Sequence, residues 1–155
     1  MDIKRCTKES FAVIGREGST LDGKNFIQKL WDGVDSHFNE ISELALKDIS
    51  GNIVGRWGLT SDFNHNLKPW EENYRRGLYL AGVECNIDAD APYGWTKWII
   101  PSYEYIYVEI ENKDTFIKTI FYLEENNIPL IGGVNKYYSP ITKKDYLFFP
   151  IKKID

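Results

Sequence analysis

The spacing of apolar residues predicts two amphipathic helices in this chain. Within residues 25–47 apolar side chains recur every three or four positions, which is the period of one helix face. Asp22 or Asn25 can cap the start of this helix, and Asp114 can cap a second one that stops at residues 126–127. The two apolar stripes consist of Phe26, Leu30, Val34, Phe38 and Ile41, continued by Leu44 or Ala45, and of Phe116, Ile120 and Leu123.

Short segments rich in β-branched and aromatic residues predict the strands. Stretches of Gly, Asp, Asn and Pro separate them, as in residues 88–94, and these residue types are typical of turns. The predicted strands are residues 11–14, 53–59, 78–87, 97–100, 103–110, 130–138 and 145–151.

The order strand, helix, strand, strand occurs twice. We therefore predict an α+β fold in a single domain, residues 1–155, built from a duplicated β-α-β-β repeat with halves of approximately 1–90 and 91–155. If each helix covers one face of its strands, the other faces of two antiparallel sheets can meet across a central cleft, with the helices on the outer faces. Clefts between similar halves are common sites for small molecules.

The high aromatic content indicates a binding surface. Aromatic residues make up 15% of the chain, with five Trp and ten Tyr. Tyr and Trp combine an apolar ring with a polar group, so they are enriched where an apolar surface meets water or a ligand.

Charge argues against nucleic acid as a direct partner. The net charge is −4 and the pI is about 5.3, whereas DNA binding rests on Lys and Arg that neutralise phosphates. Basic residues cluster only as the pairs 75–76, 143–144 and 152–153.

Cys6 and Cys85 are expected to be free thiols. The start of the chain does not look like a signal peptide, and no apolar run is long enough to cross a bilayer, so we expect a cytoplasmic protein without a membrane partner. No CxxC or HxxxH spacing indicates zinc, and we predict neither a metal nor a cofactor.

Five segments, in this order and spacing, resemble the GyrI-like effector-binding family, which is also found fused to AraC-type and MerR-type regulators. The resemblance spans nearly the whole chain. It implies a stand-alone member of the family without a DNA-binding domain, since no element here amounts to a helix-turn-helix. The segments are residues 79–84 (YLAGVE), 92–94 (PYG), 100–105 (IPSYEY), 132–140 (GGVNKYYSP) and 146–151 (YLFFPI).

The resemblance implies an aromatic cleft for amphipathic, often cationic compounds. Many members carry a Glu-x-Tyr motif whose Glu is the counter-charge in the cleft, and here Lys136 takes that position. A lysine repels a cation, so a neutral or anionic ligand is favoured unless another acid, such as Glu84, substitutes. The alternative is that Lys136 is a solvated surface lysine.

Strand parity and the resemblance together select the candidate ligand-binding residues. Tyr103, Tyr105 and Tyr107 alternate with aliphatic residues that can seat the second helix, which leaves the tyrosines for the cleft or for solvent. Glu84 has the opposite parity to Tyr79, so both can line one cleft only if a bulge lies between them. The candidates are Trp57, Tyr79, Glu84, Trp98, Tyr105, Tyr107, Lys136 and Tyr138.

For the tryptophans a structural role stays open beside a binding role. Trp57 can point into the cleft by pseudo-symmetry with residues 134–138, or it can pack under the first helix. We expect Trp31 in the core, and Trp70 and Trp95 packed on their own domain, although aromatic side chains in loops can also act as a lid.

These patterns favour the binding of an amphipathic or aromatic small molecule, for transcription control or to sequester a toxic compound. No catalytic residue is predicted, because His37 and His65 lack a nucleophile in a recognisable motif. One alternative is a hydrolase of cyclopropane-bearing compounds, which requires an acid in the cleft. Another is an interaction module acting on DNA gyrase or on a regulator.

Overall fold

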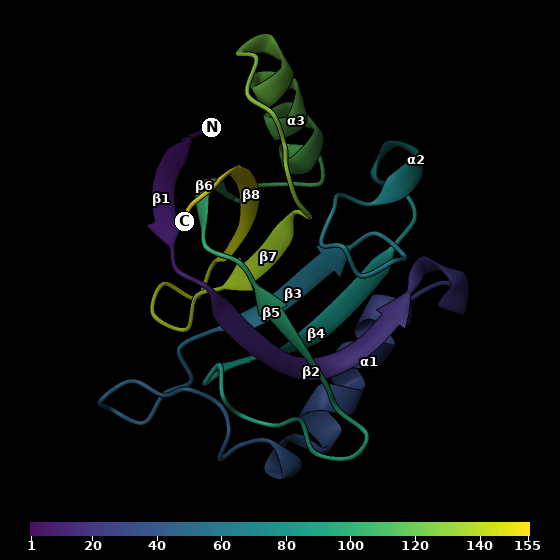
Figure 1. Ribbon diagram of the computed structural model, residues 1–155, viewed down its shortest axis with the longest axis vertical. Coiled ribbons are helices and arrows are strands. Elements are labelled where there is room, and N and C mark those ends of the chain that lie inside the picture. The colour runs from purple at the N-terminus through teal and green to yellow at the C-terminus, as the bar shows by residue number, and fades with distance from the viewer.

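A single curled antiparallel sheet of eight strands forms the framework of the protein (Figure 1). The computed structural model describes all of residues 1–155. The strands lie in the order β1-β6-β8-β7-β3-β4-β2-β5. Their bounds are β1 Lys4–Lys8, β2 Phe11–Ser19, β3 Arg56–Ser61, β4 Leu78–Cys85, β5 Thr96–Ile100, β6 Tyr103–Glu109, β7 Asn135–Tyr138 and β8 Asp145–Lys153.

The two ends of the sheet are joined by the chain itself. Strand β1 runs into β2 and pairs with β6, while β5 runs into β6 and pairs with β2. The register Lys8↔Tyr103 continues as Phe11↔Ile100, so the two pairs behave as one long antiparallel pair. Ser10 bonds across the break, because its backbone N–H donates to Ser102 Oγ at 2.8 Å. The sheet therefore curls around an interior.

The predicted α+β class is confirmed, but the two-sheet arrangement is wrong. Strands β3 and β7 pair from Arg56↔Tyr138 to Gly58↔Lys136, and this pairing merges both halves into one sheet. Each half has the same internal strand order, β2-β4-β3 and β6-β8-β7. The duplication itself stays a prediction.

The first helix is shorter than its apolar stripe predicts. Helix α1 covers Phe26–Ser36, and the chain then tightens into a 3-10 turn, η2, at Phe38–Glu40. Ile41 and Ala45 are still buried under the sheet in this turn region, so the stripe continues where the helix does not. Apolar spacing reports which positions are buried, and it does not distinguish an α-helix from tighter turns.

One further helix matches α1 in length, 11 residues, and the others are single turns. Helix α3 covers Thr115–Glu125, α2 covers Glu71–Tyr74, and a 3-10 turn, η1, covers Thr20–Asp22. None of these helices has the length and apolar character that a membrane-spanning helix requires.

Three hydrophobic clusters divide the molecule. One fills the interior of the curl, and residues from all eight strands belong to it or pack against it. The second lies between α1 and the outer face of β2 and β4, and the third lies between α3 and the outer face of β6 and β8. Both helices therefore cover the outer side of the sheet, with strands β3 and β7 between them (Figure 1).

Candidate ligand-binding cleft

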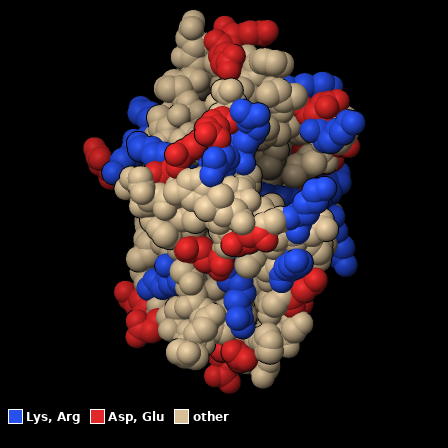
Figure 2. Space-filling model, turned by 90° about the vertical axis from the view of Figure 1, so that its right-hand side faces the viewer, with Lys and Arg blue, Asp and Glu red and all other residues tan.

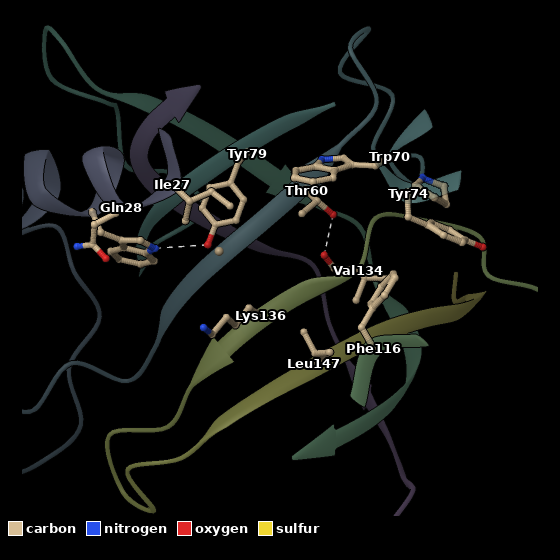
Figure 3. Close-up of a pocket in the computed structure, with 13 residues that line it drawn as sticks. Ile27, Gln28, Thr60, Trp70, Tyr74, Tyr79, Phe116, Val134, Lys136 and Leu147 are labelled. Atoms are coloured by element: carbon tan, nitrogen blue, oxygen red, sulfur yellow. Dashed lines mark hydrogen bonds between the residues drawn. The ribbon is translucent and has the colours of Figure 1, made fainter. Parts of the chain in front are cut away.

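A cavity of about 420 Å³ lies on the outer side of the sheet, between α1 and α3. Side chains from both helices, from β3, β4, β7 and β8, and from the loop that follows β3 surround it (Figure 3). Its lining consists of Ile27, Gln28, Trp31, Gly58, Thr60, Pro69, Trp70, Tyr74, Tyr79, Phe116, Val134, Lys136 and Leu147. We call this cavity the cleft.

Tyr79 and Trp31 form one wall of the cleft. Trp31 Nε1 donates to Tyr79 Oη over 3.4 Å, and burial raises the pKa of the Tyr79 phenol, so the hydroxyl stays protonated at neutral pH. Gly58 on the neighbouring strand makes room for this tyrosine, since a side chain there would collide with Tyr79 Oη. The absence of a side chain at Gly58 is therefore a condition for the shape of this wall.

The loop between β3 and β4 supplies the second wall. Trp70 Nε1 donates to the Leu78 carbonyl at 2.8 Å, which fixes its indole ring. The Tyr74 ring meets the Phe116 ring of α3 edge to face, with centroids 5.5 Å apart. Glu72, Asn73 and Tyr74 all have left-handed backbone conformations, with φ between 54° and 66°. This tight backbone turn brings Tyr74 to α3 and closes one end of the cleft.

The seam between β3 and β7 forms the floor. Thr60 Oγ1 donates to the Val134 carbonyl at 2.6 Å, and the Thr60 backbone N–H donates to Asn135 Oδ1 at 3.0 Å (Figure 3). These side-chain bonds extend the junction between the halves beyond the backbone pairing of the two strands.

A smaller hollow of about 170 Å³ continues from the cleft, and we call it the annex. The two share Trp31, Gly58 and Lys136. The annex adds Arg56, Tyr138 and Asp145.

Ion pairs hold the charged groups of the annex. Lys136 Nζ lies 3.4 Å from Asp145 Oδ2, and Arg56 Nη1 donates to Asp35 Oδ1 at 3.0 Å. The Arg56 guanidinium also lies over the Trp31 ring, 4.6 Å from its centroid. In the cleft itself Lys136 is the one charged lining residue.

Of the eight candidates from the sequence, the structure places three at this site. Tyr79 and Lys136 line the cleft, and Tyr138 lines the annex. That these residues bind a ligand stays a prediction.

Trp57, Glu84, Trp98 and Tyr105 lie on the opposite, inner side of the sheet. The structure does not bring these four residues to the cleft of Tyr79 and Lys136, because the inner faces of the strands pack on one another as a core. The β4 register is unbroken from Leu78 to Cys85, so no bulge turns Glu84 toward Tyr79. Glu84 instead accepts from Trp57 Nε1 at 2.9 Å and pairs with Lys8.

Tyr107 also belongs to the inner side. Its ring stacks on the Phe148 ring, with centroids 5.0 Å apart and planes 7° apart. The alternation of tyrosines with aliphatic residues on β6 is observed, since Ile106 and Val108 pack toward α3. The tyrosine face is turned toward the interior core rather than toward the cleft.

Sequence reasoning missed several aromatic residues of the cleft. Trp31 follows Ile27 by one helical turn, on the edge of the apolar stripe, and this second apolar edge is the signal for it. Phe116 was part of the second stripe, and its role at the cleft depends on the approach of Tyr74. The path of that loop carries no periodic signal, so Tyr74 could not be found.

The cleft is lined by apolar and neutral polar side chains and by one lysine. No carboxylate, thiol or histidine lines the cleft. His37 pairs with Glu40 and His65 with Glu17, both away from it. No group of three or more His, Cys, Asp or Glu side chains is placed to hold a metal ion, and both cysteines are free. The cavity volume is within the range of small-molecule sites, roughly 300–1,000 Å³.

Solved structures with this fold include ligand-binding and regulatory proteins. The structure of SAV2435 bound to tetraphenylphosphonium has a TM-score of 0.66 and 15% identity, with 98% of this chain and 94% of that chain covered. A candidate bacterial transcription regulation protein from Staphylococcus aureus MU50 has a TM-score of 0.61 and 15% identity, with coverages of 98% and 99%. The EcmrR C-terminal domain has a TM-score of 0.63 and 11% identity, with coverages of 99% and 98%.

No protein-family model matches the sequence, and no curated protein is significantly similar to it. The shared fold therefore rests on structure, over nearly the full length of this chain.

Proposed function

We propose that this chain is a GyrI-like effector-binding domain that takes up an aromatic or amphipathic small molecule in the cleft between α1 and α3. One observation carries the proposal. Five aromatic side chains, from α1, α3, β4 and the β3–β4 connection that contains α2, converge on a cavity that the chain leaves unfilled. They are Trp31, Trp70, Tyr74, Tyr79 and Phe116.

Aromatic walls give such a site its affinity. Ring faces and edges stack on a planar ligand, and burial of apolar surface contributes about 25 cal/mol per Å², so a drug-sized compound gains several kcal/mol. Most of the cleft is apolar, and the few polar groups at its Lys136 end would orient the compound.

The similar structures support a sensing or sequestering role. One of these structures is SAV2435 bound to tetraphenylphosphonium, and another is the C-terminal domain of EcmrR, which has the same fold. By analogy, the ligand of this chain would act as the effector of a transcription regulator, or the chain would remove the compound from solution.

Hydrolysis by the same cleft has less support. That hypothesis needs an acid at the reacting bond, and no carboxylate lines the cleft. The one carboxylate that lines the annex, Asp145, is paired with Lys136.

Isothermal titration with a panel of aromatic compounds tests the proposal, with mass spectrometry of each mixture afterwards. The matched variants are Phe116→Ala and Phe121→Ala. Both residues lie on α3, but Phe116 lines the cleft whereas the Phe121 side chain projects into solvent. We expect saturable binding of an unchanged compound, weakened about tenfold or more by Phe116→Ala and unaffected by Phe121→Ala.

Two outcomes would overturn the proposal. If no compound of the panel binds, or if both variants bind as the unchanged protein does, the cleft is not the ligand site. Conversion of a bound compound would instead favour the hydrolase.

A further inference from the structure

The cleft and the annex together form one site with two chemically different ends. Tyr74, Phe116 and Trp70 surround one end, and Lys136 lies at the other (Figure 3). The annex opens beyond Lys136, toward Arg56 and Tyr138. A ligand that fills both would need an apolar body and a polar end.

The charges at the polar end favour an anion. Two cationic side chains, Lys136 and Arg56, line the combined hollow; of the carboxylates that pair with them, Asp145 lines it and Asp35 does not. On the face of the molecule shown in Figure 2, Lys and Arg side chains lie close to the hollowed part of the surface. A cationic ligand group placed at this end would approach both cations at short range.

The cationic groups also have donors to spare. Lys136 Nζ makes no hydrogen bond within the protein, and its contact with Asp145 is ionic only. Arg56 uses one of its five N–H groups, in the bond to Asp35. A carboxylate or sulfonate can bind Arg side chains through two parallel hydrogen bonds.

The existing ion pairs are weak competitors for such a ligand. The side chains of Lys136 and Asp145 are 50% and 37% exposed, and that of Asp35 is 57% exposed. Pairs this open to water contribute little to stability, because solvent screens them. A ligand anion can therefore replace Asp145 or Asp35 as the partner of these cations at a small cost in free energy. The apolar body of the same ligand is removed from water in the cleft.

We propose that the ligand of this site is an amphipathic aromatic anion, whose ring system lies in the cleft and whose carboxylate or sulfonate lies in the annex between Lys136 and Arg56. This inference rests on the proposed function. It adds the charge class of the ligand and names Lys136 and Arg56 as the residues that select it.

Three probes with the same ring system separate charge from shape: naphthoate, naphthamide and naphthylmethylammonium. In isothermal titration we expect naphthoate to bind about tenfold or more tightly than the neutral amide, and the cation to bind weakest. Lys136→Gln and Arg56→Gln should each remove most of the preference for naphthoate over naphthamide. Lys152→Gln is the matched control, because Lys152 is an exposed lysine of β8 outside both hollows.

A charge reversal sharpens the test. Lys136→Glu should place naphthylmethylammonium above naphthoate, because the sign of the nearest charge changes. Equal affinity of all three probes, or tighter binding of the cation by the unchanged protein, would overturn the anion inference and leave the proposed function standing. Failure of all three probes to bind would count against the proposed function itself.

Discussion

Two aromatic regions lie back to back on the sheet, and only one of them is open. The interior of the curl contains Trp57, Trp98 and Tyr105, whereas Trp31, Tyr79 and other rings line the cleft. The interior is closed because β1–β2 and β5–β6 join the two ends of the sheet. The cleft stays open because α1 and α3 stand apart over the β3–β7 seam. High aromatic content therefore does not locate a binding site; the topology decides which aromatic region is accessible.

The polar groups of the two regions also differ, because the indole donors of the interior bond to the protein itself whereas the cations of the annex keep free donors. In the interior, Trp57 and Trp98 donate to the carboxylates of Glu84 and Glu17 at 2.9 and 2.7 Å. The chain thus provides a partner for both of these buried indole donors. In the annex, Lys136 keeps unused donors that face a hollow.

The largest expected effect comes from removing an interior ring. Trp57→Ala should lower the free energy of unfolding by about 3–5 kcal/mol, because the side chain is 2% exposed and packs against Phe11 and Tyr137. Its loss would also leave the partly buried carboxylate of Glu84 without an indole donor. Trp31→Ala, at the partly open cleft, should lower it by only about 1–2 kcal/mol. Urea denaturation measures both, and equal losses would contradict the distinction between a closed interior and an open cleft.

An intermediate effect on stability is expected when Gly58 is replaced. Gly58→Ala should lower the free energy of unfolding by about 1–3 kcal/mol and abolish ligand binding, since the new methyl group would displace Tyr79. Gly33→Ala is the control, because a methyl group there meets only Arg16 Cγ at 3.9 Å and lies within α1. It should raise the unfolding free energy by roughly 0.5–1 kcal/mol through helix propensity. Retained binding in Gly58→Ala would mean that the Tyr79 wall is not part of the site.

The smallest effect at neutral pH is expected at Tyr105, whose buried hydroxyl has no hydrogen-bond partner. Tyr105→Phe should leave the free energy of unfolding unchanged or raise it by up to about 1 kcal/mol near pH 7, because it removes a buried hydroxyl that forms no hydrogen bond. At alkaline pH the two proteins should diverge. Burial raises the pKa of Tyr105 in the folded state, so the folded protein keeps a proton that the unfolded chain releases above about pH 10.

Stability therefore falls as the pH rises above about 10, and Tyr105→Phe should reduce that fall. Urea titrations near neutral pH and above pH 10 measure the difference. A large decrease in the free energy of unfolding of Tyr105→Phe at neutral pH would show that the Tyr105 hydroxyl forms a hydrogen bond in solution. The interior would then not be closed to that partner.

Local patterns predicted the elements and their faces. The stripe of α3 and the alternation of Tyr105 with Ile106 give the correct buried faces, and the opposite parities of Tyr79 and Glu84 hold in the structure. Strand β1 was not predicted, because its residues are mostly polar. The pairing of β3 with β7 and of β2 with β5 joins segments far apart in the chain, and no local pattern encodes it.

The candidate site was predictable only where the resemblance supplied positions. Tyr79, Lys136 and Tyr138 came from motif positions, and they lie at the cleft or annex. The interior candidates were assigned to the cleft because parity shows that residues share a face but does not show which face is open. Trp70 and Tyr74 depend on a loop with left-handed residues, whose course follows from tertiary contacts.

The seam at the floor of the cleft has a mechanical consequence. Three backbone residue pairs join β3 to β7, from Arg56↔Tyr138 to Gly58↔Lys136, and Trp31 and Phe116 stand on either side in different halves of the chain. A compound lying across this seam touches both halves at once and acts as a reversible cross-link between them. For the compound proposed here, the binding energy would add to the cohesion of the halves and would favour one spacing of α1 and α3.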